Sequence, residues 1–227
     1  PAPPSNRRFT STTFLDIITR MEAPHEPVRI IPAMSRAWYG TSVSEFLQTQ
    51  PNTIVGQLVI SGNYALLPTQ KDAWLAQIAI LQEHLVGLTG ALFLEFNIPR
   101  MGRRIDAVLL IGPVVFVIEF KVGESAFERA AVDQVWDYAL DLKNFHEGSH
   151  SASIVPILIA TGATETPQLR LQVDGDKVYH PIQVHPASFR EAIDVSLRTV
   201  TGETLDDQQW SIAPYHPTPT IIEAARA

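Results

Sequence analysis

The stretch RRIDAVLLIGPVVFVIEFKVG, residues 103–123, decides the fold of this chain. Its two apolar runs are rich in β-branched and aromatic residues, and Gly112-Pro113 separates them, which is typical of two strands joined by a short turn. Yet the runs also contain Asp106, Glu119 and Lys121. Charges inside such strands need either partners or a use, so the same stretch is the first candidate for a functional site.

Outward from this hairpin, helical and extended patterns alternate. Helices are predicted at 69–88, about 125–147 and 188–198, and strands at 91–99, 103–111, 114–122, 153–163 and 178–186. Short connections predict an antiparallel meander for the first three strands, and the long helix predicts a crossover to a parallel neighbour. The predicted fold class is α/β, with a mixed sheet (antiparallel meander plus parallel strand) flanked by helices.

The start of the ordered region carries weaker signals. Ser42 or Ser44 is expected to cap a short helix, and the segment PNTIVGQLV, residues 51–59, is interpreted as a turn into a mixed segment. Thr69 and Asp72 resemble a capping box. Three regions are predicted: an irregular extension at 1–33, one domain at 34–202, and at 203–227 a Pro-rich linker that begins a following segment.

Composition excludes several classes of protein. The formal net charge of −7 argues against coating nucleic acid by bulk electrostatics, although it allows a metal ion to offset local carboxylates. Without cysteine, the chain has no disulfide scaffold, thiol nucleophile or Cys-ligated zinc. The longest apolar run, residues 107–118, is shorter than the roughly 20 residues that span a bilayer. We therefore expect a cytoplasmic protein with no membrane segment.

The charged residues are expected to share one face of the sheet. Residues two apart on a strand point the same way, so Glu119 and Lys121 share a face. If Met101-Gly102 is a two-residue turn, Asn97 lies opposite Asp106, and Glu95 is the diagonal neighbour of Asp106. Glu95 and Asp106 then lie on the same face of the sheet as Glu119 and Lys121 of the next strand. A register shift of one residue would break this arrangement.

Carboxylates that converge in this way repel one another, and burying them unpaired costs several kcal/mol. A divalent hard cation such as Mg²⁺ or Mn²⁺ resolves the conflict because it prefers oxygen ligands. A nearby lysine can orient or deprotonate a water molecule, or offset charge that develops on a phosphate. This set of groups is suited to hydrolysing a phosphodiester.

The spacing of these residues resembles a known pattern. Asp106 precedes Glu119-Phe120-Lys121 by twelve intervening residues, and Gln134 and Tyr138 follow on the next predicted helix. This D-x12-E-F-K arrangement with Q-x-x-x-Y resembles the PD-(D/E)XK nuclease superfamily, in particular its RecB-type members. Ile105 stands where the superfamily pattern has proline.

The resemblance extends over roughly residues 34–223. Segments such as FNIPRMGRRIDAVLL and QVWDYALDLKNFH resemble the N-terminal nuclease-like domain of bacterial proteins that continue into a Schlafen-related superfamily-1 ATPase/helicase. The resemblance implies a restriction-endonuclease-like sheet, DNA as the substrate and a C-terminal ATPase/helicase domain as partner. No G-x-x-x-x-G-K-[ST] motif occurs here, so that ATPase lies outside this sequence.

Roles for individual residues follow from the resemblance. Asp106 and Glu119 would bind Mg²⁺ or Mn²⁺ together with the backbone carbonyl of Phe120, and Lys121 would position the attacking water. The residues implied to line the substrate groove or brace the site are Gln134 and Tyr138.

Further residues have open roles. Glu95 is a candidate additional metal ligand and ranks above Glu83, which lies off the apolar stripe of its helix. Arg100, Arg103 and Arg104 flank the predicted turn and are candidates for phosphate contact, with a solvated loop as the alternative. In a regular strand Arg104 shares the face of Asp106, whereas Arg103 is one residue out of phase.

Taken together, the sequence predicts a Mg²⁺- or Mn²⁺-dependent nuclease that hydrolyses DNA, with strand preference left open. The rival hypothesis is a catalytically silent module that binds nucleic acid or a partner beside an ATPase motor. A third hypothesis is a dimeric, restriction-like endonuclease. A zinc site at His146 and His150, four residues apart, is ranked far below these.

Overall fold

The computed structural model describes residues 36–62, 67–164, 168–219 and 221. The extension predicted at 1–33 lies outside the described residues. The strands are β1 (Ala37–Ser42), β2 (Ala91–Ile98), β3 (Arg103–Ile111), β4 (Val114–Lys121), β5 (Ser153–Ala160) and β6 (Ile182–Val184). The helices are α2 (Val43–Gln48), α3 (Pro51–Gly62), α4 (Pro68–His84), α5 (Arg129–Phe145), α6 (Phe189–Thr199) and α7 (Asp207–Ile212).

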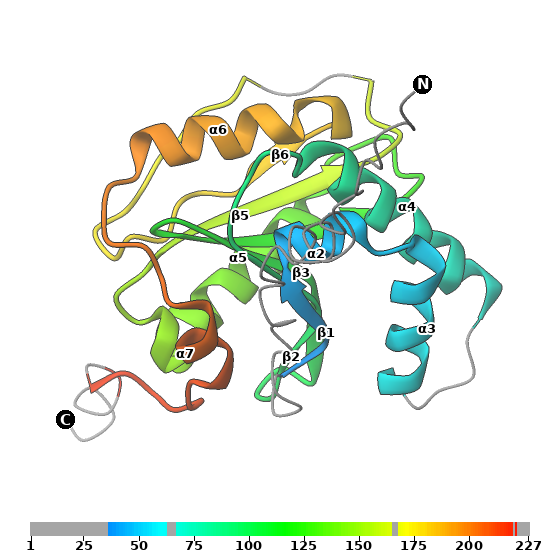
Figure 1. Cartoon of the computed structure of the whole chain (residues 1–227). Helices are drawn as coiled ribbons and strands as arrows, with labels where there is room; N and C mark the ends of the chain where they lie inside the picture. Colours follow the sequence, from blue (N-terminus) through cyan, green and yellow to red (C-terminus); the bar gives the residue numbers. More distant parts are fainter. Residues whose placement is uncertain (1–35, 63–66, 165–167, 220, 222–227) are drawn as a thin grey trace, which may run out of the picture. The chain divides into compact units, whose positions relative to one another are not determined.

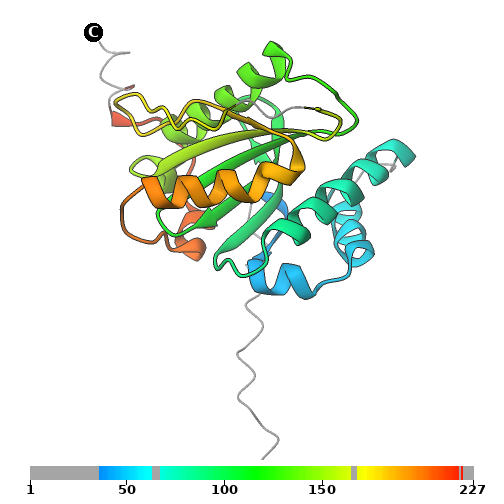
Figure 2. The same cartoon turned by 90° about the horizontal axis from the view of Figure 1, so that it is seen from above.

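The six strands form a single mixed sheet in sequence order (Figure 1). β1 to β4 pair antiparallel, while β5 and β6 continue the sheet parallel to β4. Helices lie against both faces, as the positions of α6 and α5 illustrate (Figure 2). The predicted α/β class, an antiparallel meander followed by parallel pairing through a crossover helix, is confirmed.

The central hairpin has the geometry that its sequence demands. Ile111 and Val114 are paired, so Gly112-Pro113 is a two-residue turn, and Gly112 has the positive φ of 55° that favours glycine at the first turn position. β4 is buried from Val114 to Phe120 because it is central and covered on both faces.

Two apolar clusters sandwich the sheet. One contains buried residues of α2, α3, α4 and α6, and the other contains those of α5 together with Trp210 of α7. Because each cluster uses alternate residues of β4, Glu119 and Lys121 emerge on the α5 side at the end of a strand that is otherwise apolar.

Several local predictions need correction. Residues 51–62 form α3, because Ile54, Val55 and Leu58 place one apolar face against the core. Thr69 does not cap α4, whose N-cap is Leu67 with no side-chain hydrogen bond. Ser42 does cap α2, and it accepts a hydrogen bond from the Glu45 backbone N–H at 3.2 Å. The preceding strand, β1, was not predicted.

Part of the segment predicted as a linker from residue 203 packs in the folded body. It forms α7, whose Trp210 is 2 % exposed and packs beside Phe93 and Phe96. Trp210 Nε1 donates to Ser149 Oγ at 3.0 Å, which ties this segment to the short turn, residues 147–149, that follows α5. Among the described helices, none has the length and apolar character that a membrane-spanning segment requires.

His146 belongs to this core and is fully buried. Burial, followed by the charge of Arg36, lowers its pKa to about 3. We expect its imidazole to stay neutral from pH 8 to pH 5 in an NMR titration, while the exposed His216 titrates. Because the unfolded chain binds this proton near pH 6.5, unfolding free energy should fall by about 1.4 kcal/mol per pH unit below that value. Titration of His146 near pH 6.5 would contradict this expectation.

Candidate active site

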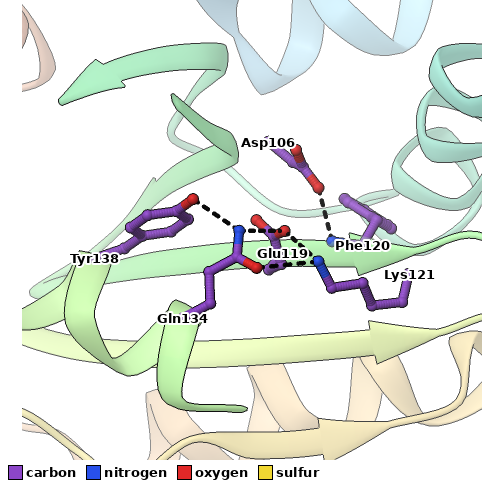
Figure 3. A network of polar contacts seen from close by, with 6 residues as sticks. All are labelled: Asp106, Glu119, Phe120, Lys121, Gln134 and Tyr138. Carbon is purple, nitrogen blue, oxygen red and sulfur yellow. Dashed lines mark hydrogen bonds and ion pairs between the residues drawn. The ribbon is translucent and has the colours of Figure 1, made fainter. Parts of the chain in front are cut away.

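The site lies at a fork where β3 separates from β4. The two strands stay paired as far as Ala107 and Ile118, and the ladder ends at Asp106. There the Asp106 side chain replaces the missing strand contact, because its Oδ2 accepts the Phe120 backbone N–H at 2.8 Å (Figure 3). This hydrogen bond fixes the carboxylate beside the strand that carries Glu119.

Glu119 and Lys121 form a close pair on β4. Lys121 Nζ donates to Glu119 Oε1 at 2.8 Å, and the Glu119 side chain is only 6 % exposed. Lys121 also reaches Gln134 Oε1 of α5 at 3.1 Å. The predicted convergence of two acids and one amine, distant in sequence, therefore occurs in the structure (Figure 3).

Helix α5 braces this pair from the adjoining layer. Gln134 Nε2 donates to Glu119 Oε1 at 2.9 Å and to the Tyr138 hydroxyl at 2.7 Å. Gln134 and Tyr138 are four residues apart and share one helix face, as their spacing predicts. The Tyr138 ring is buried in the α5-side cluster, so the hydroxyl is the part of this residue that faces the site.

The register between β2 and β3 differs from the predicted one by two residues. The connecting loop has four residues, 99–102, so Asn97 pairs with Arg104 and not with Asp106. A shift of two residues preserves the face to which each side chain points, whereas a shift of one would reverse it. Glu95, predicted as the diagonal neighbour of Asp106, therefore falls directly opposite it, between the pairs Leu94–Ala107 and Phe96–Ile105.

The regular alternation of side chains breaks at that level. Leu94 packs in the α4-side cluster, yet Phe96 packs in the α5-side cluster, and Glu95 between them has φ = 53°. β3 shows the same reversal around Asp106. A left-handed glutamate costs on the order of 1 kcal/mol or more and persists only where its surroundings hold it.

The surroundings of Glu95 do hold it. Its two carboxylate oxygens accept from Trp74 Nε1 at 2.7 Å and from Arg104 Nε at 2.6 Å. The Arg104 guanidinium also lies 4.1 Å from the ring centroid of Trp38. Since both oxygens are engaged, Glu95 fastens the hairpin to α4 and β1. The alternative acid, Glu83, is exposed on α4 and does not line the cavity described below.

The predicted phosphate contacts at Arg100 and Arg104 also have intramolecular partners. The Arg100 guanidinium stacks 3.5 Å from the Phe145 ring centroid, and its Nε lies 3.9 Å from Asp141 Oδ2. Arg103 was predicted to be out of phase with Asp106, but it lines the same cavity because the alternation reverses at Asp106.

A cavity of about 460 Å³ opens beside Asp106, and Glu119 and Lys121 are not among its lining residues. Its lining comes from α4, the β2–β3 hairpin and α5: Gln70, Ala73, Trp74, Gln77, Glu95, Gly102, Arg103, Arg104, Asp106, Gln134 and Tyr138. Sequence reasoning missed the α4 wall. Trp74 was assigned to the core from its helical spacing, and it is buried, but the same spacing says nothing about its indole N–H.

Burial and neighbouring charges shift the pKa values of the groups at the fork. Burial raises the pKa of Asp106 well above its usual range, and the nearby Glu119 raises it further. Burial also raises the pKa of Glu119, although Lys121 opposes that effect. Burial alone would lower the pKa of Lys121, but the hydrogen bond and charge of Glu119 outweigh it, and the net shift is upward. Lys121 is therefore protonated at neutral pH.

The donor set is compatible with a divalent cation on one specific ground. Glu119 Oε2 is buried and has no hydrogen-bond partner, which is costly for a carboxylate oxygen. The described residues contain no cluster of three or more Asp, Glu, His or Cys side chains arranged to hold a metal. Two carboxylates with a backbone carbonyl and water molecules would still suit Mg²⁺, which keeps several waters in protein sites.

A second cavity, of about 480 Å³, lies beside α7 and is lined by residues including Trp210, Ile212 and Pro214. It contains none of the acids of the fork, so the chemistry favours the first cavity. Comparisons with protein-family models, with curated proteins and with solved structures found no match to this chain.

Proposed function

We propose that this chain is a divalent-metal-dependent nuclease that hydrolyses phosphodiester bonds in DNA. One observation carries the proposal. Asp106 and Glu119 lie at one fork of the sheet with an ammonium group beside them, and a buried Glu119 oxygen there lacks a partner. DNA as the substrate, and an ATPase/helicase as the attached partner, rest on the sequence resemblance alone.

The metal would be Mg²⁺ or Mn²⁺, held by Asp106 and Glu119. The backbone carbonyl of Phe120 would be a third ligand, because in a strand the N–H and C=O of one residue point to the same side, and this N–H points to Asp106. A bound divalent ion would polarise the scissile phosphate and lower the pKa of the attacking water.

The remaining groups act through hydrogen bonds. Lys121, held by Glu119 and Gln134, presents its protonated amine as a donor to the water or to the phosphate oxygens, which offsets charge in the transition state. Gln134 fixes both Glu119 and Lys121, so it is a positioning residue. The raised pKa of Lys121 favours orientation of water over its deprotonation.

The proposal is tested by incubating the chain with labelled single-stranded and double-stranded DNA in Mg²⁺, Mn²⁺ or EDTA. We expect cleavage in either metal, none in EDTA, and cleavage slowed at least a hundredfold with Asp106→Ala or Lys121→Ala. Cleavage that persists in EDTA or in both variants would contradict the mechanism. DNA binding without cleavage by the wild type would instead favour a silent binding module.

A further inference from the structure

We propose that Arg103 is the residue that binds a backbone phosphate of the substrate strand in the cavity. This inference rests on the proposed function for the identity of the ligand as a nucleic acid. It assigns a positioning role to a residue that regular strand alternation had excluded from the face of Asp106.

Arg103 is placed at the cavity by the break in alternation described above. It is the first residue of β3, its side chain is exposed, and it lines the cavity together with Asp106 and Tyr138. The pKa of Tyr138 is raised chiefly by burial, and the positive charge of Arg103 is one of the influences that oppose this rise. Arg103 and the Tyr138 residue of α5 thus line one cavity.

The neighbouring cations already have intramolecular partners. Lys121 is bound to Glu119 and Gln134, and Arg104 is bound to Glu95 at 2.6 Å. No ion pair or hydrogen bond joins the Arg103 side chain to another described residue. Of the two arginines that line the cavity, Arg103 is therefore the one with its whole guanidinium available to an incoming anion, whereas Arg104 has its Nε committed to Glu95.

A backbone phosphate is the anion that suits this position. A guanidinium offers a planar, bidentate set of donors to phosphate oxygens, and such contacts fix the register of a strand without reading its sequence. The rest of the chain has a net negative charge, so nonspecific attraction contributes little. Loss of one phosphate contact should therefore be visible in the salt dependence of binding.

The experiment measures binding of labelled single-stranded and duplex DNA by fluorescence anisotropy over a range of NaCl concentrations, in EDTA and in Ca²⁺. We expect Arg103→Ala to weaken binding roughly tenfold at low salt. The slope of log K against log salt should fall by about 0.7 for single strands or about 0.9 for duplex. Arg103→Lys should keep the slope. Arg198→Ala, an exposed arginine on α6 outside the cavity, should change neither quantity.

The outcomes separate this inference from the proposed function. Cleavage in Mg²⁺ with an unchanged salt slope in Arg103→Ala overturns the role of Arg103 alone. A reduced slope without cleavage by the wild type supports the role of Arg103 and refutes the nuclease. If the wild type binds neither DNA in either buffer, the inference fails together with its substrate. Equal losses in Arg103→Ala and Arg198→Ala would reduce the effect to general surface charge and overturn the assignment.

Discussion

Replacing Asp106 with asparagine is expected to abolish metal-dependent cleavage while leaving the fold at least as stable as in the wild type. Asparagine keeps an oxygen that accepts the Phe120 N–H, so the hydrogen bond at the fork survives. It also removes an acid whose pKa is raised by burial and, next, by the charge of Glu119. Loss of a metal ligand worth several kcal/mol should slow cleavage about 10³-fold or more.

The measurement compares cleavage rates in Mg²⁺ with thermal unfolding in EDTA. The wild type should gain stability as Mg²⁺ is added, because the ion binds only the folded state, and Asp106→Asn should gain much less. Asp137→Asn, an exposed acid on α5, serves as the matched control and should behave as the wild type in both assays. A fully active Asp106→Asn, or one that is unfolded at room temperature, would contradict the assigned role.

The coarse geometry of this site could be predicted because it depends on the alternation of side chains between the two faces of a strand. Glu119 and Lys121 share a face in any regular strand, and the real β2–β3 register differs from the predicted one by two residues, which leaves faces unchanged. The long apolar run of β4 predicted a buried strand, and the spacing of apolar residues in α5 predicted a helix that packs on the sheet.

The predictions that were wrong concern irregular backbone and polar groups within apolar sequence patterns. The reversal at Glu95 rests on a left-handed φ that no residue type at this position signals, since glycine would be the usual choice. Because of this reversal, Arg103 lines the cavity, although regular alternation predicted that it points to the other face. The α3 helix was obscured by Pro51, Gly56 and a β-branched pair, which tertiary packing overrides.

Replacing Lys121 with methionine should be the second most damaging change to activity. The variant keeps the aliphatic stem but removes the amine that contacts Glu119 and Gln134. By analogy with the loss of one oriented donor at a reaction centre, cleavage should slow by about 10² to 10³-fold. Buried Glu119 loses its cation, so its affinity for Mg²⁺ should be kept or increased, as measured by the metal-induced rise in unfolding temperature.

The pH dependence of the cleavage rate distinguishes the two roles that the Lys121 amine can have, a hydrogen-bond donor or a general base. If Lys121 donates as an ammonium, the wild-type rate should not rise as pH approaches its pKa, because that pKa is shifted upward and the active form is the protonated one. A general base would give the opposite slope. Lys143→Met controls for loss of a buried ammonium, since Lys143 donates to the Ala152 carbonyl and does not line the cavity. If Lys143→Met slows cleavage as much as Lys121→Met, the loss is structural; if only Lys121→Met does, the donor at the fork is responsible.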